Sequence, residues 1–401
     1  MRLWVGVDAG KSAHHAVAMD EDGKVHLSRK VPNTEDDLLT LLGEVGRLAD
    51  GEDVVWACDL NGGGAGLLIA ILTAHAQTLL YIPGRTVYHA AASYRGDGKT
   101  DAKDARIIAD QARMRRDLHP VRAGDPAATE LRMLSAHRAD LVADRTRAIN
   151  RLRATLMEYF PSLEAAFDYS QRQAALTLLT KYATPDALRS AGVEKVTTWL
   201  KSQGCYASKR VATIAVEAAD RQHTTVPGQD TAAMLVGRLA ADALRLFEEV
   251  KEVESQLDAR FRSHEHAELL LSLPGFGPTL AAEFIAATGG DMTLFGSPER
   301  LAAVAGLAPV PRDSGKISGN MRRPRRYDRR LLRACYMAAN VAAQFCEISK
   351  AFYTRKRAEG KTHTQAVLAL ARRRINVIWA MLRDRTPYGQ PAPTAALQAA
   401  T

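Results

Sequence analysis

Strand-forming apolar residues gather in short stretches of the first hundred positions, and residues 24–31 alternate apolar and polar in the pattern of a half-buried strand. A polar Asp-Glu-Asp-Gly turn at 20–23 separates the second and third of these stretches and indicates a hairpin. The predicted strands occupy residues 3–8, 14–19, 24–31, 54–60 and 78–82. Helical spacing of apolar residues predicts helices over 35–49, which Thr34 can cap, and over 65–76. This order of elements predicts an α/β domain built on a mixed sheet.

After residue 100 the pattern is mostly helical. In 131–160 and in 235–261, apolar residues recur at steps of three, four, seven or eight and form two long stripes. Each stripe needs an apolar partner, which is either the other stripe or a second subunit, and we expect this region to carry self-association. The segment between them, about 161–230, has shorter helical patterns and no recognisable chemistry.

The length of 401 residues allows two to three domains at about 150 residues each. We expect an α/β catalytic domain at 1–125 and a helical coiled-coil or oligomerisation region at 126–265. A mainly helical C-terminal domain at 266–386 and a disordered tail at 387–401 complete the expected order.

An excess of 54 Lys and Arg over 45 Asp and Glu gives a net charge of +9, which favours a polyanionic partner. The four cysteines lie far apart without a Cys-x-x-Cys pair, so a disulfide framework or structural zinc site is not expected. Neither an apolar N-terminal stretch nor a run of about 18 apolar residues occurs. We therefore expect a cytoplasmic protein with no membrane partner.

Four aspartates lie at the ends of predicted strands and at the start of a predicted helix, and together they suggest a metal site. Asp8 and Asp59 end apolar strands, where an unpaired buried charge is costly. Asp101 and Asp104 lie three apart in the first turn of a helix that Thr100 can cap. The order of elements is that of RNase H-like folds, whose acids bind Mg²⁺ or Mn²⁺ against a phosphodiester. The alternative is that these acids are turn residues and partners of a helix dipole.

Residues 269–279 contain Leu-Pro-Gly-Phe-Gly between two predicted helices, a string that resembles the helix-hairpin-helix signature. Gly275 and Gly277 permit a tight turn, and amides at the start of the next helix can bind a nucleic-acid phosphate. The alternative is a plain turn between helices.

The stretch 312–333 carries nine basic residues against two acidic ones, as expected of a nucleic-acid surface. Its candidate contacts are Arg312, Lys316, Arg322, Arg323, Arg325, Arg326, Arg329 and Arg330. Further basic groups lie at 355–357 and 372–374. Ser314 and Ser318, each followed by glycine, could attack phosphorus with arginines stabilising the transition state. A solvated charged face with turn serines is the alternative.

Three strings together resemble the DEDD transposases of the insertion sequence IS110 family, relatives of the Piv-type DNA invertases. They are VGVDAGKS, KTDAKDAR, and LPGFG followed by FGSPERLAAVAGLAPVPRDSGK. The resemblance covers most of the chain. It implies an RNase H-like (RuvC-like) N-terminal domain, a coiled-coil middle region and a C-terminal transposase domain with the helix-hairpin-helix-like element.

Residue by residue, the resemblance places the four family acids at Asp8, Asp59, Asp101 and Asp104, and the serine nucleophile at Ser314 rather than Ser318. The second acid of the family is usually Glu, whereas Asp59 is one methylene shorter. The family implies Mg²⁺-dependent recombination through a covalent serine–DNA intermediate. It further implies a noncoding bridge RNA that pairs with donor and target DNA, and a homo-oligomer, dimer or tetramer.

Three other functions fit parts of the sequence. VGVDAGKS resembles the first phosphate motif of actin-like sugar kinases, but the second half of the chain is helical and basic rather than nucleotide-binding. A RuvC-like junction resolvase would use the four acids with water as nucleophile. A non-catalytic DNA-architectural protein would leave the acids unexplained.

Overall fold

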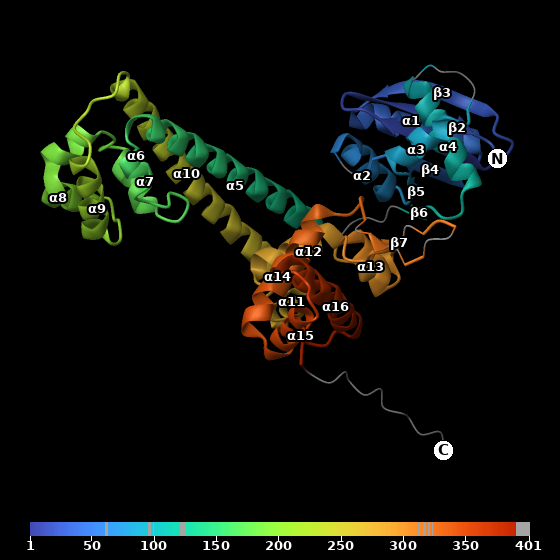
Figure 1. The fold of residues 1–401 in the computed structure, drawn as a ribbon. Coiled ribbons are helices and arrows are strands. Elements are labelled where there is room, and N and C mark those ends of the chain that lie inside the picture. Colours follow the sequence, from blue (N-terminus) through green and yellow to red (C-terminus); the bar gives the residue numbers. More distant parts are fainter. Residues whose placement is uncertain are drawn as a thin grey trace. The chain divides into compact units, whose positions relative to one another are not determined.

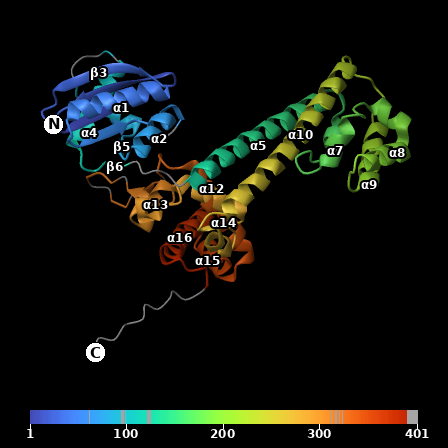
Figure 2. The same cartoon turned by 180° about the vertical axis from the view of Figure 1, so that it is seen from behind.

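The computed structural model describes residues 1–60, 63–94, 98, 100–120, 126–311, 313–315, 318–319, 321–322 and 324–389. The chain forms two compact units, Met1–Gly124 and Asp125–Thr401 (Figures 1 and 2). The first is a mixed α/β unit and the second is mainly helical, which confirms the coarse fold class expected from the sequence. Among the described residues, no helix has both the length and the apolar character needed to cross a bilayer.

The first unit contains a six-stranded mixed sheet with strand order β3-β2-β1-β4-β5-β6. The strands are β1 Leu3–Ala9, β2 Ala13–Met19, β3 Val25–Pro32, β4 Val54–Cys58, β5 Thr78–Tyr81 and β6 His119–Pro120. The first three form an antiparallel meander, β1, β4 and β5 run parallel, and β6 pairs antiparallel with β5. The five strands expected from the hydrophobic pattern are all present within a few residues of their predicted bounds.

Helices cover both faces of this sheet. They are α1 Glu35–Ala49, α2 Gly66–Ala74, after the 3₁₀ turn Gly63–Ala65, α3 Gly84–Ala91 and α4 Asp101–Met114. Alternate residues of β1 separate into two cores, with Val5 and Val7 packed among α1 and α2 side chains and Trp4 among α4 side chains. By the same two-residue period, Asp8 lies on the α4 face.

Two long helices, α5 Pro126–Tyr159 and α10 Gln229–Arg262, run side by side through the second unit (Figures 1 and 2). Their apolar stripes meet in a core formed by Leu141, Leu246, Val250 and Val253. Ion pairs flank the contact, with Arg138 Nε 2.7 Å from Glu254 Oε1 and Arg260 Nη2 2.8 Å from Glu130 Oε1. The stripes are therefore buried against each other within one chain, and self-association no longer follows from them.

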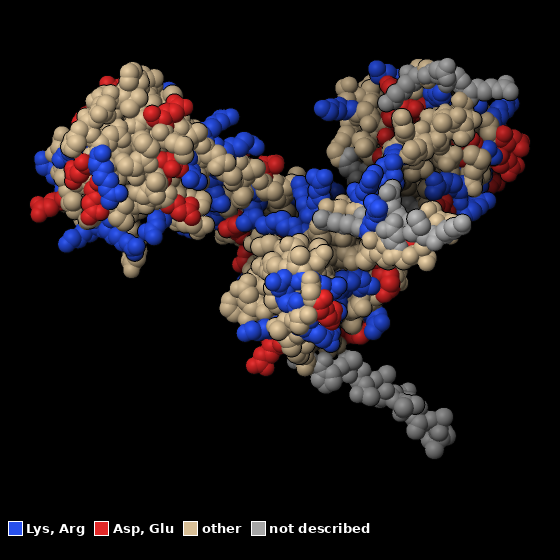
Figure 3. Space-filling view, viewed as in Figure 1, with Lys and Arg blue, Asp and Glu red and all other residues tan. Residues whose placement is uncertain are grey.

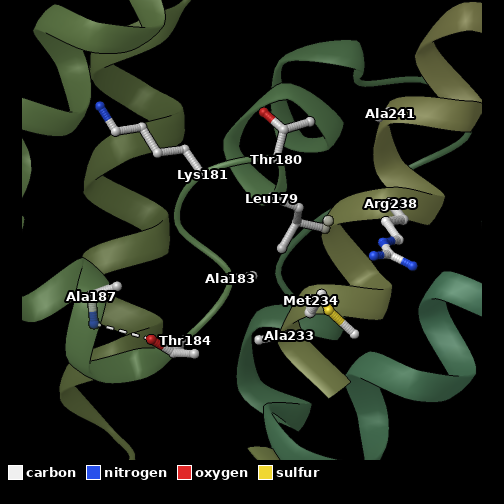
Figure 4. A pocket seen from close by; sticks show the side chains of 11 residues that line it. Leu179, Thr180, Lys181, Ala183, Thr184, Ala187, Ala233, Met234, Arg238 and Ala241 are labelled. Carbon is white, nitrogen blue, oxygen red and sulfur yellow. Dashed lines mark hydrogen bonds between the residues drawn. The ribbon is translucent and has the colours of Figure 1, made fainter. Parts of the chain in front are cut away.

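Four short helices pack against one end of the α5–α10 pair. They are α6 Pro161–Glu164, α7 Gln173–Leu179, α8 Pro185–Ser202 and α9 Ser208–Asp220. They share a core with the C-terminal half of α5 and the N-terminal half of α10. A groove of about 500 Å³ lies between the α7–α8 connection and α10 (Figure 4). Lys181 and Arg238 line this groove, and its lining contains no carboxylate, histidine or cysteine, so we do not consider it a catalytic site.

The other end of the pair packs into a larger helical core. Its elements are α11 Ala267–Ser272, α12 Pro278–Thr288, the 3₁₀ turn Met292–Phe295, α13 Pro298–Val304, strands β7 Val310–Pro311 and β8 Met321–Arg322, α14 Arg329–Phe345, α15 Glu347–Ala358 and α16 His363–Asp384. The backbone N–H of Tyr388 donates to Ser272 Oγ at 2.9 Å, so the packed chain extends past the predicted tail start at 387. Most of that predicted tail, 390–401, lies outside the described residues.

Candidate active site

Two of the predicted acids follow neighbouring parallel strands at the same edge of the sheet. Val7 of β1 is in register with Cys58 of β4, so the next residues along, Asp8 and Asp59, lie at the same level. The backbone N–H of Ala9 donates to Asp59 Oδ1 at 3.3 Å, which ties the two strand ends together. The sheet therefore brings Asp8 and Asp59 to one place.

Helix α4 carries the other two acids across the same face. The Thr100 side chain caps it by accepting a hydrogen bond from the Lys103 N–H at 3.2 Å, as the sequence predicted. An added Cβ at Gly6 would lie 2.1 Å from the Ala105 carbonyl oxygen and 2.3 Å from the Ala109 nitrogen. Glycine at position 6 thus lets α4 lie directly on β1, and Asp104 immediately precedes the point of contact.

The Asp59 carboxylate is in an unfavourable environment for a charge. Burial raises its pKa, and the nearby Asp104 carboxylate raises it further, against the hydrogen bond from Ala9 that lowers it. Two acids 45 residues apart in sequence therefore repel each other across β4 and α4. A cation held near these acids would lower the cost of that buried charge.

Carboxylates are the type of ligand that a hard divalent cation prefers. Mg²⁺ typically binds a few carboxylates, and water and phosphate oxygens fill the rest of its coordination shell. As the side chains stand, the described residues contain no group of three or more His, Cys, Asp or Glu close enough to share an ion. The strand ends supply two carboxylates and the start of α4 supplies two more.

Two histidines of β2 adjoin the acids, and the sequence analysis did not identify them. His15 pairs with Asp8 across the strands, interacts electrostatically with Asp101, and lies 3.1 Å from Ser28 Oγ through its Nε2. His14, on the opposite face, is 1% exposed, and burial lowers its pKa. The two-residue strand period was the signal that could have placed His15 beside Asp8.

The predicted nucleophile lies in the second unit, on a short hairpin. Strands β7 and β8 pair with Val310 opposite Arg322 and Pro311 opposite Met321, so Ser314 and Ser318 fall in the connecting loop. Both serines are exposed, and Gly315 and Gly319 after them adopt positive φ. The ring of Tyr327 packs on Gly306 at the base of this hairpin, where an added Cβ would lie 2.6 Å away.

The described basic residues of this region are exposed. Arg322, Arg325 and Arg326 lie in or after the hairpin, and Arg329 and Arg330 begin α14, whose N-terminus Asp328 caps. Figure 3 shows Lys and Arg side chains gathered along α5 and over the C-terminal helices. Three further candidates, Arg312, Lys316 and Arg323, lie outside the described residues.

The turn Leu273–Gly277 joins α11 to α12 as predicted. Gly275 has φ +89°, and an added Cβ would lie 2.2 Å from the Ala338 carbonyl oxygen of α14. This glycine is thus required for close packing of the turn on α14. Gly277 caps α12 without a side-chain hydrogen bond, and Pro278 follows as the first helical residue. The amides of the first turn of α12 therefore have no side-chain cap, which is the arrangement that suits a phosphate.

Known proteins resemble the chain along its whole length. Residues 5–161 match a family model described as "Transposase", and residues 267–354 match one described as "Transposase IS116/IS110/IS902 family". The chain is 58% identical to the uncharacterized 42 kDa protein of insertion element IS900 from Mycobacterium paratuberculosis, over 98% of this chain and 99% of the relative. The chain belongs to the IS116/IS110/IS902 transposase family. It is therefore an insertion-sequence transposase, an enzyme that cuts and rejoins DNA.

Two other relatives of this transposase share nearly its full length. The uncharacterized 44.8 kDa protein of insertion element IS116 from Streptomyces clavuligerus is 50% identical over 98% of this chain and 97% of the relative. The uncharacterized 43.6 kDa protein of insertion element IS110 from Streptomyces coelicolor is 35% identical over 98% of this chain and 96% of the relative. The first matched segment of the transposase contains all four acids, and the second contains Ser314 and the turn at Gly275.

We predict that Asp59→Asn stabilises the metal-free protein at pH 7 by about 1 kcal/mol, or about 2–4 °C in Tm. The amide keeps an acceptor for the Ala9 N–H but removes a buried charge near Asp104. The pKa of Asp59 is higher in the folded than in the unfolded protein. The charged carboxylate therefore costs no folding stability below the unfolded-state pKa, and this cost grows as the pH rises through the folded-state pKa. Thermal melts with a chelator at pH 4 and pH 7 measure this. A gain of equal size at both pH values would contradict it.

Proposed function

We propose that this transposase cuts and rejoins DNA with a divalent-metal site formed by Asp8, Asp59, Asp101 and Asp104, and with Ser314 as the nucleophile. The observation that carries the proposal is the register of β1 with β4, which puts Asp8 and Asp59 at one edge of the sheet, together with the close packing on Gly6 of α4, the helix that carries Asp101 and Asp104. The strand order 3-2-1-4-5, antiparallel and then parallel, supports an RNase H-like fold for residues 1–125.

The four carboxylates would hold Mg²⁺ or Mn²⁺ through the two strand ends and the first turn of α4. Bound there, the ion supplies a Lewis acid for a phosphoryl oxygen. Asp59 is one methylene shorter than the glutamate usual at this place in the family, and the bond from Ala9 N–H holds its Oδ1 at the strand end. The shorter side chain therefore keeps its carboxylate close to the sheet edge, near Asp104.

Ser314 would attack the scissile phosphorus through its Oγ. The new Oγ–P bond forms as the bond from phosphorus to one DNA oxygen breaks, and the serine proton leaves with the departing hydroxyl. A DNA hydroxyl then attacks the same phosphorus, which rejoins the strand and restores the serine. Exposure of Ser314 on a glycine-bearing loop supports this role, because no helix obstructs the hydroxyl. Acids in one unit and a serine in the other require the two units to act together.

The other expected features belong to the same proposal. The α11–α12 turn would serve as a helix-hairpin-helix element, with α12 amides on a phosphate of the DNA. The paired helices of 126–265 would act as a coiled coil, and 266–386 as the transposase domain. A noncoding bridge RNA and a dimer or tetramer follow from the family resemblance, and the exposed arginines of 322–330 suit either nucleic acid.

The proposed function is tested by expressing the protein together with the noncoding DNA that flanks its gene, followed by deep sequencing of new DNA junctions. Recombination predicts precise donor–target junctions that depend on the flanking DNA. A junction resolvase with a water nucleophile would leave nicks with free ends and no new junctions. That result would overturn the proposal.

We predict that Arg322→Ala, Arg325→Ala and Arg326→Ala together flatten the log–log salt slope of duplex binding by up to about 2.7 units, about 0.9 per lost phosphate contact. The control combines Arg147→Ala, Arg245→Ala and Arg262→Ala, which removes three arginines paired to carboxylates on α5 and α10. Fluorescence anisotropy from 50 to 300 mM salt measures both. Equal slopes for the two triple variants would mean that the hairpin arginines contact no phosphate.

A further inference from the structure

A second pocket lies in the C-terminal part of the chain, away from Ser314 in sequence. It has a volume of about 140 Å³ and is enclosed by the end of α11, by α15 and by α16. Phe352 and Val377 are among its apolar walls. Its polar lining consists of Ser349, Arg373, Arg374 and Tyr388. At about 30 Å³ per water, the space equals four to five waters, enough for a tetrahedral phosphate group.

Arg374 is a buried cation, 5% exposed, with no carboxylate partner among the described residues. The ionisable groups that act on it electrostatically are the Cys346 and Cys335 thiols and the Tyr388 hydroxyl. Its guanidinium donates to Ser349 Oγ at 3.4 Å and to the carbonyl oxygen of Pro274, while Nε has no hydrogen-bond partner. Burial lowers its pKa. A buried guanidinium that lines a pocket and has no carboxylate partner attracts an anion.

Arg373, the next residue, adds a second guanidinium to the lining. Its guanidinium carbon lies 5.0 Å from the centre of the Phe352 ring. The same ring centre is 5.1 Å from Arg355 and 5.6 Å from Lys356. Glu359 pairs with Lys356 and lies near Arg355, but within the residues that the structure describes Arg373 has no ion pair. Three cations thus lie near the Phe352 ring, and Arg373 is the one of them that lines the pocket.

We propose that this pocket binds a phosphate group of a nucleic-acid strand, through Arg373 and Arg374. Guanidinium donors match phosphate oxygens in geometry and charge. A nucleic acid is favoured over a free anion because Arg374 also holds the Leu273–Gly277 turn through Pro274, next to the uncapped amides of α12. A strand that contacts those amides would have further phosphates for the pocket. The inference requires nucleic-acid binding only and is independent of the acids and of Ser314.

The test uses full-length protein with Arg373→Gln, because this exposed residue can change without disturbing the core, whereas Arg374→Gln would remove buried contacts to Ser349 and Pro274. Arg383→Gln is the matched control, since it removes the same charge from α16 at a residue paired with Asp384 and outside the pocket. The first measurement is the salt slope of binding to a single-stranded and to a duplex oligonucleotide. The second is Tm in inorganic phosphate against chloride at equal ionic strength.

We expect Arg373→Gln to lower the salt slope by about 0.7 units on single strands or about 0.9 on duplex, and Arg383→Gln to leave it unchanged. Inorganic phosphate should raise Tm of the wild type and the control by more than it raises Tm of Arg373→Gln. If phosphate discriminates the variants but neither oligonucleotide does, the pocket takes a free anion and the proposal is wrong. If neither measurement separates Arg373→Gln from the control, the pocket binds no phosphate. Loss of recombination without either change would concern the active site alone.

Discussion

Replacing Asp59 or Asp104 with asparagine should abolish strand cleavage, with a loss in rate of at least about 10³-fold, while DNA binding stays within about twofold. Asp59 follows β4 and Asp104 lies on α4, which packs on β1 at Gly6, and asparagine keeps the shape of either side chain but not the charge that would hold a divalent ion. Phosphate contacts lie on other elements, so affinity should persist. Cleavage of a labelled DNA and a filter-binding assay on the same preparations measure the two effects.

Asp110→Asn provides the matched control on the same helix. Asp110 accepts a hydrogen bond from Tyr94 Oη at 2.6 Å and pairs with Arg113 at 2.7 Å, so its charge has a structural partner. We expect its activity to remain within a few fold of the wild type. Equal activity of Asp59→Asn and Asp110→Asn in cleavage would show that the acids at the sheet edge do no chemistry.

Ser314→Ala should eliminate the covalent protein–DNA adduct completely, because alanine has no oxygen to bond phosphorus. A DNA substrate with a nick near the cleavage point traps the intermediate, since the released fragment cannot rejoin. The wild type should then shift on a denaturing gel and Ser314→Ala should not. The exposed position of Ser314 on the β7–β8 loop makes a folding defect in this variant unexpected.

Ser318→Ala is the control for this experiment. It changes a serine of the same loop, also exposed and also followed by a glycine of positive φ. Its adduct should equal that of the wild type. An adduct in Ser314→Ala that disappears in Ser318→Ala would assign the nucleophile to Ser318, and an adduct in both variants would exclude a serine mechanism on this loop.

Local patterns were sufficient to predict much of the first unit. The strand formers of 3–8 and the alternation over 24–31 predicted β1 and β3, and Thr34 and Thr100 predicted the starts of α1 and α4. Strand composition, strand period and helix caps are properties of neighbouring residues. The same reasoning explains Asp8, which the strand period directs toward α4. The elements that carry the predicted acids could thus be placed from the sequence, although the distances between the acids could not.

What the sequence left open depends on contacts between distant residues. The stripes of 131–160 and 235–261 had two possible partners, and only the packing of Leu141 against Leu246 and Val250 selects one. Gly6 and Gly275 give no sequence signal for the helices that lie on them, α4 and α14. Arg374 looked like one of three consecutive surface arginines, but the helix turns it inward beneath the Pro274 carbonyl. Burial of that kind follows from tertiary packing and not from composition.

Crystals soaked in Mn²⁺ would test the proposed metal site at the edge of the first sheet. The anomalous difference map should contain a peak within about 2.5 Å of carboxylate oxygens of Asp8 and Asp59 and of at least one acid of α4. The same soak of Asp59→Asn crystals should show a weaker peak or none. A Mn²⁺ peak elsewhere, or an empty sheet edge at saturating Mn²⁺, would contradict the account.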